Sequence, residues 1–463
     1  MVACDSVAID SADELRFGKS LTPLTTRRGL AIGAGTVYPE LNFTLPAMSI
    51  TEESWPEIVR QYREIITDAL ERARRLHCRG LVVEFETLPD MTRRPEWAVE
   101  IAGVLQEALD EAHSQWGLPC ALRVTPNDNR DMQRPPRMRG GQLWEQTLTT
   151  FAGAAELGAD LLAIESTGGK EVHDTALTMG DLPQVMFALC VMGVRDMKFV
   201  WSHITDIAAG HEHVHAAGDT ACGFANTAMV LAEQNMIPKV FAAVVRAVSA
   251  VRSLVAYQCG AVEPGKDCGY ENIILKAITG LPMSMEGKTA ACAHSSPLGN
   301  VAAAAADLWS NESVQNVRLL GGWAPSCYLE QLEYDCRLLN TAAEQGPEAA
   351  MQLRDCLVDS DASLDPQAFI LTPESAVTLA RAIVGADSYY QAGRAVAATA
   401  LRILRDGRDD DLVDVPPREV RWLDIMEAAV EGLPDDEGEF IDRMMAQVDT
   451  SKFIPEDYDL PAG

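Results

Sequence analysis

The chain has 463 residues, and 38 basic side chains against 68 acidic ones give it a formal net charge of −30. Nucleic acids and anionic membrane surfaces attract Lys and Arg side chains, so this charge disfavours both kinds of partner. Apolar residues make up 47% of the chain, which is typical of a folded globular protein and not of a disordered one.

Short β-rich runs alternate with helical stretches up to about residue 295. Helical patterns at 56–76 and 95–115 stand between neighbouring runs. Strands that alternate with helices indicate βαβ units and a parallel sheet, and eight such strands would close a (β/α)8 TIM barrel. The eight candidate strands are residues 30–34, 81–86, 121–125, 161–165, 199–203, 214–217, 254–258 and 282–285.

The β pattern fades from about residue 296, and Ala-rich helical patterns follow. We therefore expect an α/β chain whose residues 1–295 form a TIM-barrel catalytic domain with an N-terminal extension. Residues 296–463 would form a helical C-terminal extension that packs on the barrel. The expected helices of this extension cover residues 301–309, 328–343, 374–384, 389–404 and 420–430.

The cysteines and the N-terminus indicate a cytoplasmic protein. Eleven scattered cysteines, with no Cys-x-x-Cys pair, argue against a disulfide framework. The N-terminal residues mix acids into their apolar stretch, unlike a secretory signal peptide. The apolar window 240–251 contains Arg246 and is too short to span a membrane.

Three residues that could bind a metal follow predicted strands. Glu165 ends an apolar run, Cys222 stands in the segment AGDTACG, and Cys268 stands in PGKDCGYEN beside Lys266, whose charge we expect to lower the thiol pKa. Taken singly, these could be a helix-capping glutamate and two buried free cysteines. The carboxyl ends of barrel strands face the active site, so the three could meet there. Two thiolates and a carboxylate would make a zinc site with an open fourth position, as in catalytic zinc centres.

A histidine run offers a competing metal site. His211, His213 and His215 alternate, so on a strand they would point to one face, and Asp206 precedes them. A surface run is the ordinary interpretation of the same pattern. Four further polar residues near strand ends could line the barrel mouth as supporting or proton-transfer groups. These are Glu84, Glu86, Arg123 and Asp128.

Long segments of the chain closely resemble the zinc-bearing subunit of methanol:corrinoid methyltransferase. The likeness is carried by LAIGAGTVYPELN, EFETLPDM, CALRVT, ADLLAIESTGGKEV, AGDTACGFANTAM, RSLVAYQCGAVEPGKDCGYENIILKAITG and MEGKTAACAHSS. The resemblance implies a TIM barrel with extra helices and one Zn²⁺ held by Glu165, Cys222 and Cys268, which would be both metal ligands and catalytic residues. It also implies that the methyl group of methanol passes to the cobalt of a corrinoid.

The resemblance implies partners as well. The chain has no Asp-x-His-x-x-Gly corrinoid-ligand motif, so a separate corrinoid-binding protein would carry the cobalt. We expect a small-molecule methyl donor, a homodimer core, and no nucleic-acid or membrane partner. Three alternatives remain open at this point. The donor could be another small methoxy or methylated compound, the histidine run could serve a metal-dependent TIM-barrel lyase or hydrolase, and the zinc could be purely structural.

Overall fold

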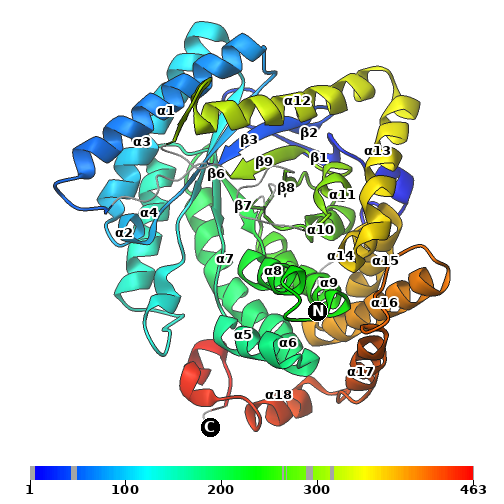
Figure 1. Cartoon of the computed structure of the whole chain (residues 1–463). Coiled ribbons are helices and arrows are strands. Elements are labelled where there is room, and N and C mark those ends of the chain that lie inside the picture. The colour runs from blue at the N-terminus through cyan, green and yellow to red at the C-terminus, as the bar shows by residue number, and fades with distance from the viewer. Residues whose placement is uncertain are drawn as a thin grey trace.

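A curled parallel β-sheet forms the centre of the molecule (Figure 1). Within the described residues it has seven strands in the order β7-β6-β5-β4-β3-β9-β8, and all neighbouring strands are parallel. The strands are β3 (Tyr38–Asn42), β4 (Leu81–Glu86), β5 (Cys120–Thr125), β6 (Leu161–Ile164), β7 (His215–Asp219), β8 (Ser284–Glu286) and β9 (Leu308–Glu312). The computed structural model describes residues 6–42, 49–262, 265–266, 268–287, 296–312 and 317–461.

Described residues between the end of helix α9 (Lys239–Gln258) and the start of the next helix contact both edge strands, β7 and β8. The N–H of Val262, which follows α9, donates to the Ala216 carbonyl of β7 at 3.0 Å. Nδ2 of Asn272, the first residue of that next helix, donates to the Ser284 carbonyl of β8 at 3.0 Å. The expected α/β fold is therefore confirmed in a TIM-barrel-like form. The described residues supply seven strands to this sheet where the sequence predicted eight.

The predicted strand at residues 30–34 does form, but it does not belong to the barrel. It appears as β2 (Ala31–Ala34), which pairs antiparallel with β1 (Lys19–Thr25) in a separate two-stranded sheet. An apolar run shows that a segment is buried, but it does not show which strand is its partner.

Two other predicted strands are wrong because they are helical. Residues 199–203 lie in α7 (Val194–Ala209), and residues 254–258 form the last turns of α9. Short apolar runs suit a buried helix as well as a buried strand, and only length and context separate the two. Helix α9 is also long and apolar enough to cross a membrane, but 94% of its most apolar window is buried inside the protein. We therefore interpret it as a core helix.

Two barrel strands were not predicted. One is β3, which contains a proline and a glutamate, and the other is β9. The predicted helix at 301–309 is instead split between the short helix α11 (Gly299–Ala303) and β9. Since β9 pairs with both β3 and β8, the barrel sheet continues past the predicted boundary at residue 295.

Most predicted helices are confirmed, with ends shifted by a few residues. Proline stands in the first turn of several of them, where its missing N–H leaves no hydrogen bond unmade. The remaining barrel helices are α1 (Trp55–Leu76), α2 (Pro89–Thr92), α3 (Pro95–Trp116), α4 (Gln142–Glu156), α5 (Lys170–Met179), α6 (Leu182–Phe187), α8 (Thr227–Glu233) and α10 (Asn272–Thr279).

Several of the C-terminal helices contact elements of the barrel. Helix α12 contacts α1 and β3, α15 contacts α10, and α16 contacts α9. Figure 1 shows these helices, coloured yellow-green to red, in an arc that runs from α12 at the top down the right of the view to α18 at the bottom. They are α12 (Ala324–Glu344), α13 (Pro347–Asp361), α14 (Pro366–Ile370), α15 (Pro373–Val384), α16 (Tyr389–Asp409), α17 (Val420–Glu431) and α18 (Glu437–Met445).

The end of the chain returns to the barrel. A short 3₁₀ turn, η7 (Pro455–Tyr458), places the Tyr458 side chain in the interior, where its hydroxyl accepts a hydrogen bond from Gly169 N–H at 3.0 Å. Asp457 accepts from Met138 N–H at 2.6 Å, and Arg139 pairs with Asp459 at 2.6 Å. The tail therefore fixes the loop that follows β6.

Candidate metal centre

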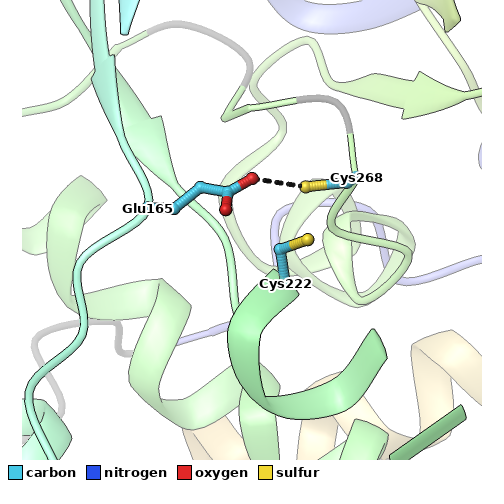
Figure 2. Close-up of side chains that lie close together, drawn as sticks. All are labelled: Glu165, Cys222 and Cys268. Atoms are coloured by element: carbon cyan, nitrogen blue, oxygen red, sulfur yellow. Dashed lines mark hydrogen bonds between the residues drawn. The ribbon is translucent and has the colours of Figure 1, made fainter. Parts of the chain in front are cut away.

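The structure brings Glu165, Cys222 and Cys268 together at the carboxyl end of the sheet (Figure 2). Glu165 follows β6 directly, and Cys222 begins the π-helical turn η4 (Cys222–Asn226) after β7. Cys268 lies between α9 and α10 in the sequence. One ligand atom from each residue lies within 4.8 Å of the other two, and Cys268 Sγ is 2.8 Å from Glu165 Oε1.

The chemistry of this donor set fits a soft divalent cation. Burial raises the pKa of the Cys268 thiol well above its usual value. The contact with Cys268 lowers the pKa of Cys222, but burial together with the nearby charge of Glu165 raises that pKa to about 12. Both thiols are therefore neutral near pH 7 in the protein alone. A cation between them favours the thiolates, and two thiolates with one carboxylate match the ligands that zinc prefers.

Lys266 lies beside the three donor side chains and is fully buried. Its Nζ is 3.2 Å from Glu165 Oε1, 3.8 Å from Cys268 Sγ and 3.5 Å from Glu86 Oε2. Lys266 acts on the Cys268 pKa in the predicted direction and lowers it, but burial of the thiol and the neighbouring Cys222 and Glu165 outweigh this effect, so the net pKa is raised. Lys266 also pairs with the two carboxylates and holds them near the cysteines.

A small polar cavity adjoins the three residues. Its volume is about 190 Å³, and its lining includes Glu86, Asp128, Asp131, Glu165 and Phe224. A water molecule in the liquid takes roughly 30 Å³, so the cavity has room for a very small substrate and a few waters. Burial, together with the neighbouring Asp128, raises the pKa of Asp131.

The four predicted mouth residues divide into two pairs. Glu86 and Asp128 line the cavity, whereas Glu84 and Arg123 lie opposite one another inside the barrel and are fully buried. Arg123 Nε pairs with Glu40 Oε1 at 2.6 Å. Residues two apart on a strand face the same side, so Glu84 points inward like Glu86 but one pleat deeper. The sequence pattern correctly predicted that these side chains face the inside of the barrel, but it did not predict how deep in the barrel each one lies.

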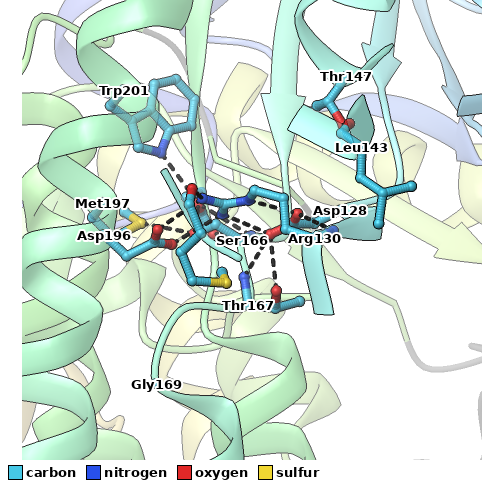
Figure 3. Close-up of polar contacts among 12 residues, drawn as sticks. Asp128, Arg130, Leu143, Thr147, Ser166, Thr167, Gly169, Asp196, Met197 and Trp201 are labelled. Carbon is cyan, nitrogen blue, oxygen red and sulfur yellow. Dashed lines mark hydrogen bonds and ion pairs between the residues drawn. The ribbon is translucent and has the colours of Figure 1, made fainter. Parts of the chain in front are cut away.

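A buried polar network holds the loop that carries Glu165 (Figure 3). Asp128 accepts from the Thr167 N–H at 2.9 Å and from its hydroxyl at 3.0 Å. The guanidinium of Arg130 lies between Asp128 and Asp196, at 2.7 Å and 2.8 Å. These groups come from three separate segments, so nothing in the local sequence marks Arg130 as their common partner.

A second buried group joins the loops of Glu165 and Cys222. Asp219, the last residue of β7, accepts from the Ser166 hydroxyl at 2.6 Å and from Trp201 Nε1 at 3.2 Å. Arg252 of α9 donates to the carbonyls of Ser166 and Thr220 at 2.5 Å and 3.2 Å. The loop that carries Glu165 and the loop that carries Cys222 are thus fixed to each other by buried hydrogen bonds. Asp219 was visible in the sequence as part of AGDTACG, but its role was not recognised.

The histidine run lies at the other end of the barrel strands. His211 and His213 belong to the turn between α7 and β7, and His215 is the first residue of β7, paired with Leu161 at the start of β6. Cys222 follows the opposite end of β7. The histidines therefore stand a strand length away from the candidate metal centre.

We expect the variant with His211, His213 and His215 all changed to Ala to keep any metal bound by Glu165, Cys222 and Cys268 and to keep its activity within about twofold, because the histidines lie a strand length away from those three residues. Elemental analysis and a methyl-transfer assay measure the two quantities. Loss of both would place the metal at the histidines and support the lyase or hydrolase alternative.

Comparisons with known proteins agree over the whole chain. The family model described as methanol-cobalamin methyltransferase B subunit matches residues 2–459. The curated methanol–corrinoid protein co-methyltransferase of Methanosarcina barkeri is 39% identical in an alignment of 461 positions that covers 98% of each protein. The crystal structure of the methanol:cobalamin methyltransferase complex from the same organism contains a chain with a TM-score of 0.94 and 38% identity, with 99% of each chain covered. The similarity therefore includes the helical C-terminal half.

Proposed function

Because this chain belongs to the methanol-cobalamin methyltransferase B subunit family, we propose that it is a zinc-dependent enzyme that transfers the methyl group of methanol to the cobalt of a corrinoid on a partner protein. The observation that carries the zinc assignment is the cluster of Glu165, Cys222 and Cys268, with ligand atoms within 4.8 Å of one another, beside a cavity of about 190 Å³. Family membership supports methanol over the other methyl donors.

The reaction breaks the carbon–oxygen bond of methanol and forms a carbon–cobalt bond, with the oxygen leaving as water after it takes up a proton. Glu165, Cys222 and Cys268 would hold the zinc ion, which would supply Lewis-acid stabilisation of negative charge on the departing oxygen. The protein contributes a preformed site, since Arg252 and Asp219 fix the ligand loops and Lys266 holds the carboxylates. Preorganised groups of this kind need little rearrangement during the reaction.

The small cavity restricts the substrate. Its walls carry carboxylates and Phe224, and its volume suits methanol rather than a bulky donor. A corrinoid is far too large to enter it. The methyl acceptor therefore has to approach across the open face of the cavity, where the in-line geometry needed for transfer can be reached.

We also propose that the protein works in the cytoplasm as a homodimer core that binds the corrinoid protein. The nine described cysteines are all free, which supports a reducing compartment. Light scattering of the purified protein measures its mass in solution, and a monomer at working concentrations would contradict the homodimer.

The proposal predicts methyl transfer to cob(I)alamin that depends on methanol and on zinc. The purified chain, mixed with methanol and either free cob(I)alamin or its corrinoid protein, should convert the cob(I)alamin spectrum into that of methylcob(III)alamin. A chelator should stop the conversion and added zinc should restore it, while ethanol and methylamine serve as control donors. Methyl transfer from methanol with no corrinoid of any kind would overturn the mechanism, and faster reaction with a control donor would overturn the substrate.

A further inference from the structure

One buried amide contacts both cysteine ligands. Asn226 is the last residue of the turn η4, and Cys222 is the first. Asn226 is buried, with 3% of the residue exposed. Its Nδ2 donates to the Cys268 backbone carbonyl at 2.8 Å and lies 3.5 Å from Cys222 Sγ. Cys222 and Cys268 come from different segments of the barrel, so a single amide group links the two segments at the candidate metal centre.

The orientation of this amide is fixed from its other end. Arg246 Nη2 donates to Asn226 Oδ1 at 2.9 Å, which assigns that atom as the oxygen and leaves the NH₂ group facing the cysteines. Arg246 is fully buried in α9 and also donates to the Ala225 carbonyl at 3.2 Å. Its Nε donates to Gln367 Oε1 of α14 at 3.2 Å. A chain of hydrogen bonds therefore runs from the C-terminal helices to the cysteines.

We infer that Asn226 is a positioning residue for the metal centre, which sets the separation of Cys222 and Cys268 and donates a hydrogen bond to the Cys222 sulfur. This inference rests on the proposed zinc-dependent function. A hydrogen bond to a ligand sulfur withdraws electron density from it, so the sulfur donates less charge to the metal. With two thiolate ligands, a zinc ion is a weaker Lewis acid than with three neutral ligands, and the Asn226 amide offsets part of that loss.

The alternative is that Asn226 only satisfies buried backbone and arginine groups. Loss of such a contact would lower the melting temperature without changing the electronic state of the bound metal. The two roles differ in a spectroscopic signature, because the thiolate-to-metal charge-transfer absorption of a cobalt(II)-substituted site depends on hydrogen bonding at the sulfur. Zinc affinity provides a second readout.

The test compares Asn226→Ala and Asn226→Asp with the unchanged protein. The Asp variant has nearly the same shape and keeps an oxygen for Arg246, but it has no N–H to donate. We expect both variants to bind zinc about 10- to 100-fold more weakly in competition with a chelator, as is usual when a supporting partner of a metal ligand is lost. We also expect their cobalt(II) charge-transfer band to shift. Asn300→Ala is the control, since Asn300 bonds Ser360 and Asp361 instead.

Each outcome decides between the roles. Wild-type zinc affinity and an unchanged band in the folded Asp variant would overturn the inference, even if its melting temperature falls. If the Ala variant does not fold, the Asp variant carries the test alone. Absence of a thiolate charge-transfer band in the unchanged protein would refute the proposed zinc site itself, so the two failures are distinguishable.

Discussion

Replacement of Cys222, Cys268 or Glu165 by alanine should remove most of the bound zinc and lower methyl transfer by more than about 100-fold, while the fold is kept. Each residue supplies one of three donor groups that lie within 4.8 Å of one another. Loss of a supporting partner alone typically costs 10- to 100-fold in metal affinity or activity, so loss of a ligand should cost more. Elemental analysis should fall from about one zinc per chain, and circular dichroism should stay unchanged.

A matched control is Cys356→Ala, because Cys356 is a free, exposed cysteine of α13. This variant should keep its zinc and its activity. Zinc retained by all three ligand variants would disprove the assignment. Unfolding of the ligand variants on loss of zinc would instead indicate a structural metal, since structural zinc contributes directly to folding free energy.

The Arg130→Met substitution should destabilise the protein by about 3 to 5 kcal/mol, because it leaves two buried carboxylates without their cation. Arg130 is fully buried and bonds Asp128 and Asp196 through two nitrogens each (Figure 3). It also donates to the Met138 carbonyl at 2.9 Å. Methionine fills a similar volume but offers no donor, so these acceptors lose their partner. Urea denaturation measures the change in the free energy of unfolding.

The control for this prediction is Arg63→Met, which removes an exposed pair with Glu107 at 3.6 Å and should change stability by less than about 1 kcal/mol. Because Asp128 also accepts from Thr167, Arg130→Met should weaken zinc binding too, by loosening the loop that carries Glu165. A loss of stability no larger than that of the control would show that the buried pair is not needed for the fold.

The sequence predicted the proximity of Glu165, Cys222 and Cys268 better than it predicted the strands that lead to them. Residues 254–258 were predicted as the strand before Cys268 and are helical, yet Cys268 still lies beside Glu165. The reason is that described residues on both sides of Cys268 are tied to the sheet, Val262 to Ala216 of β7 and Asn272 to Ser284 of β8, so Cys268 is held near the carboxyl ends of the strands. For the position of Cys268, the order of the elements along the chain mattered more than whether residues 254–258 form a strand or a helix.

Other features could not be obtained from the sequence for physical reasons. The net pKa of Cys268 depends on how deeply the thiol is buried as well as on the charge of Lys266, and the local sequence carries no measure of that depth. The Arg130–Asp196 pair joins residues 66 positions apart, so only the folded chain shows it. Asn226 lies in one of the segments that carry the family resemblance, but its contact partner Cys268 is 42 positions away in the sequence, so only the folded chain shows the contact.

The contact between Tyr458 and Gly169 also has a consequence for synthesis, because the ribosome adds Tyr458 289 residues after Gly169. Ribosomes add roughly 5 to 20 residues per second, so about 15 to 60 s separate the appearance of the two residues. During that time a nascent barrel has no tail to fix the loop after Glu165. The last anchor of the loop beside the candidate metal centre is therefore added well after the strands of the described barrel sheet have been synthesised.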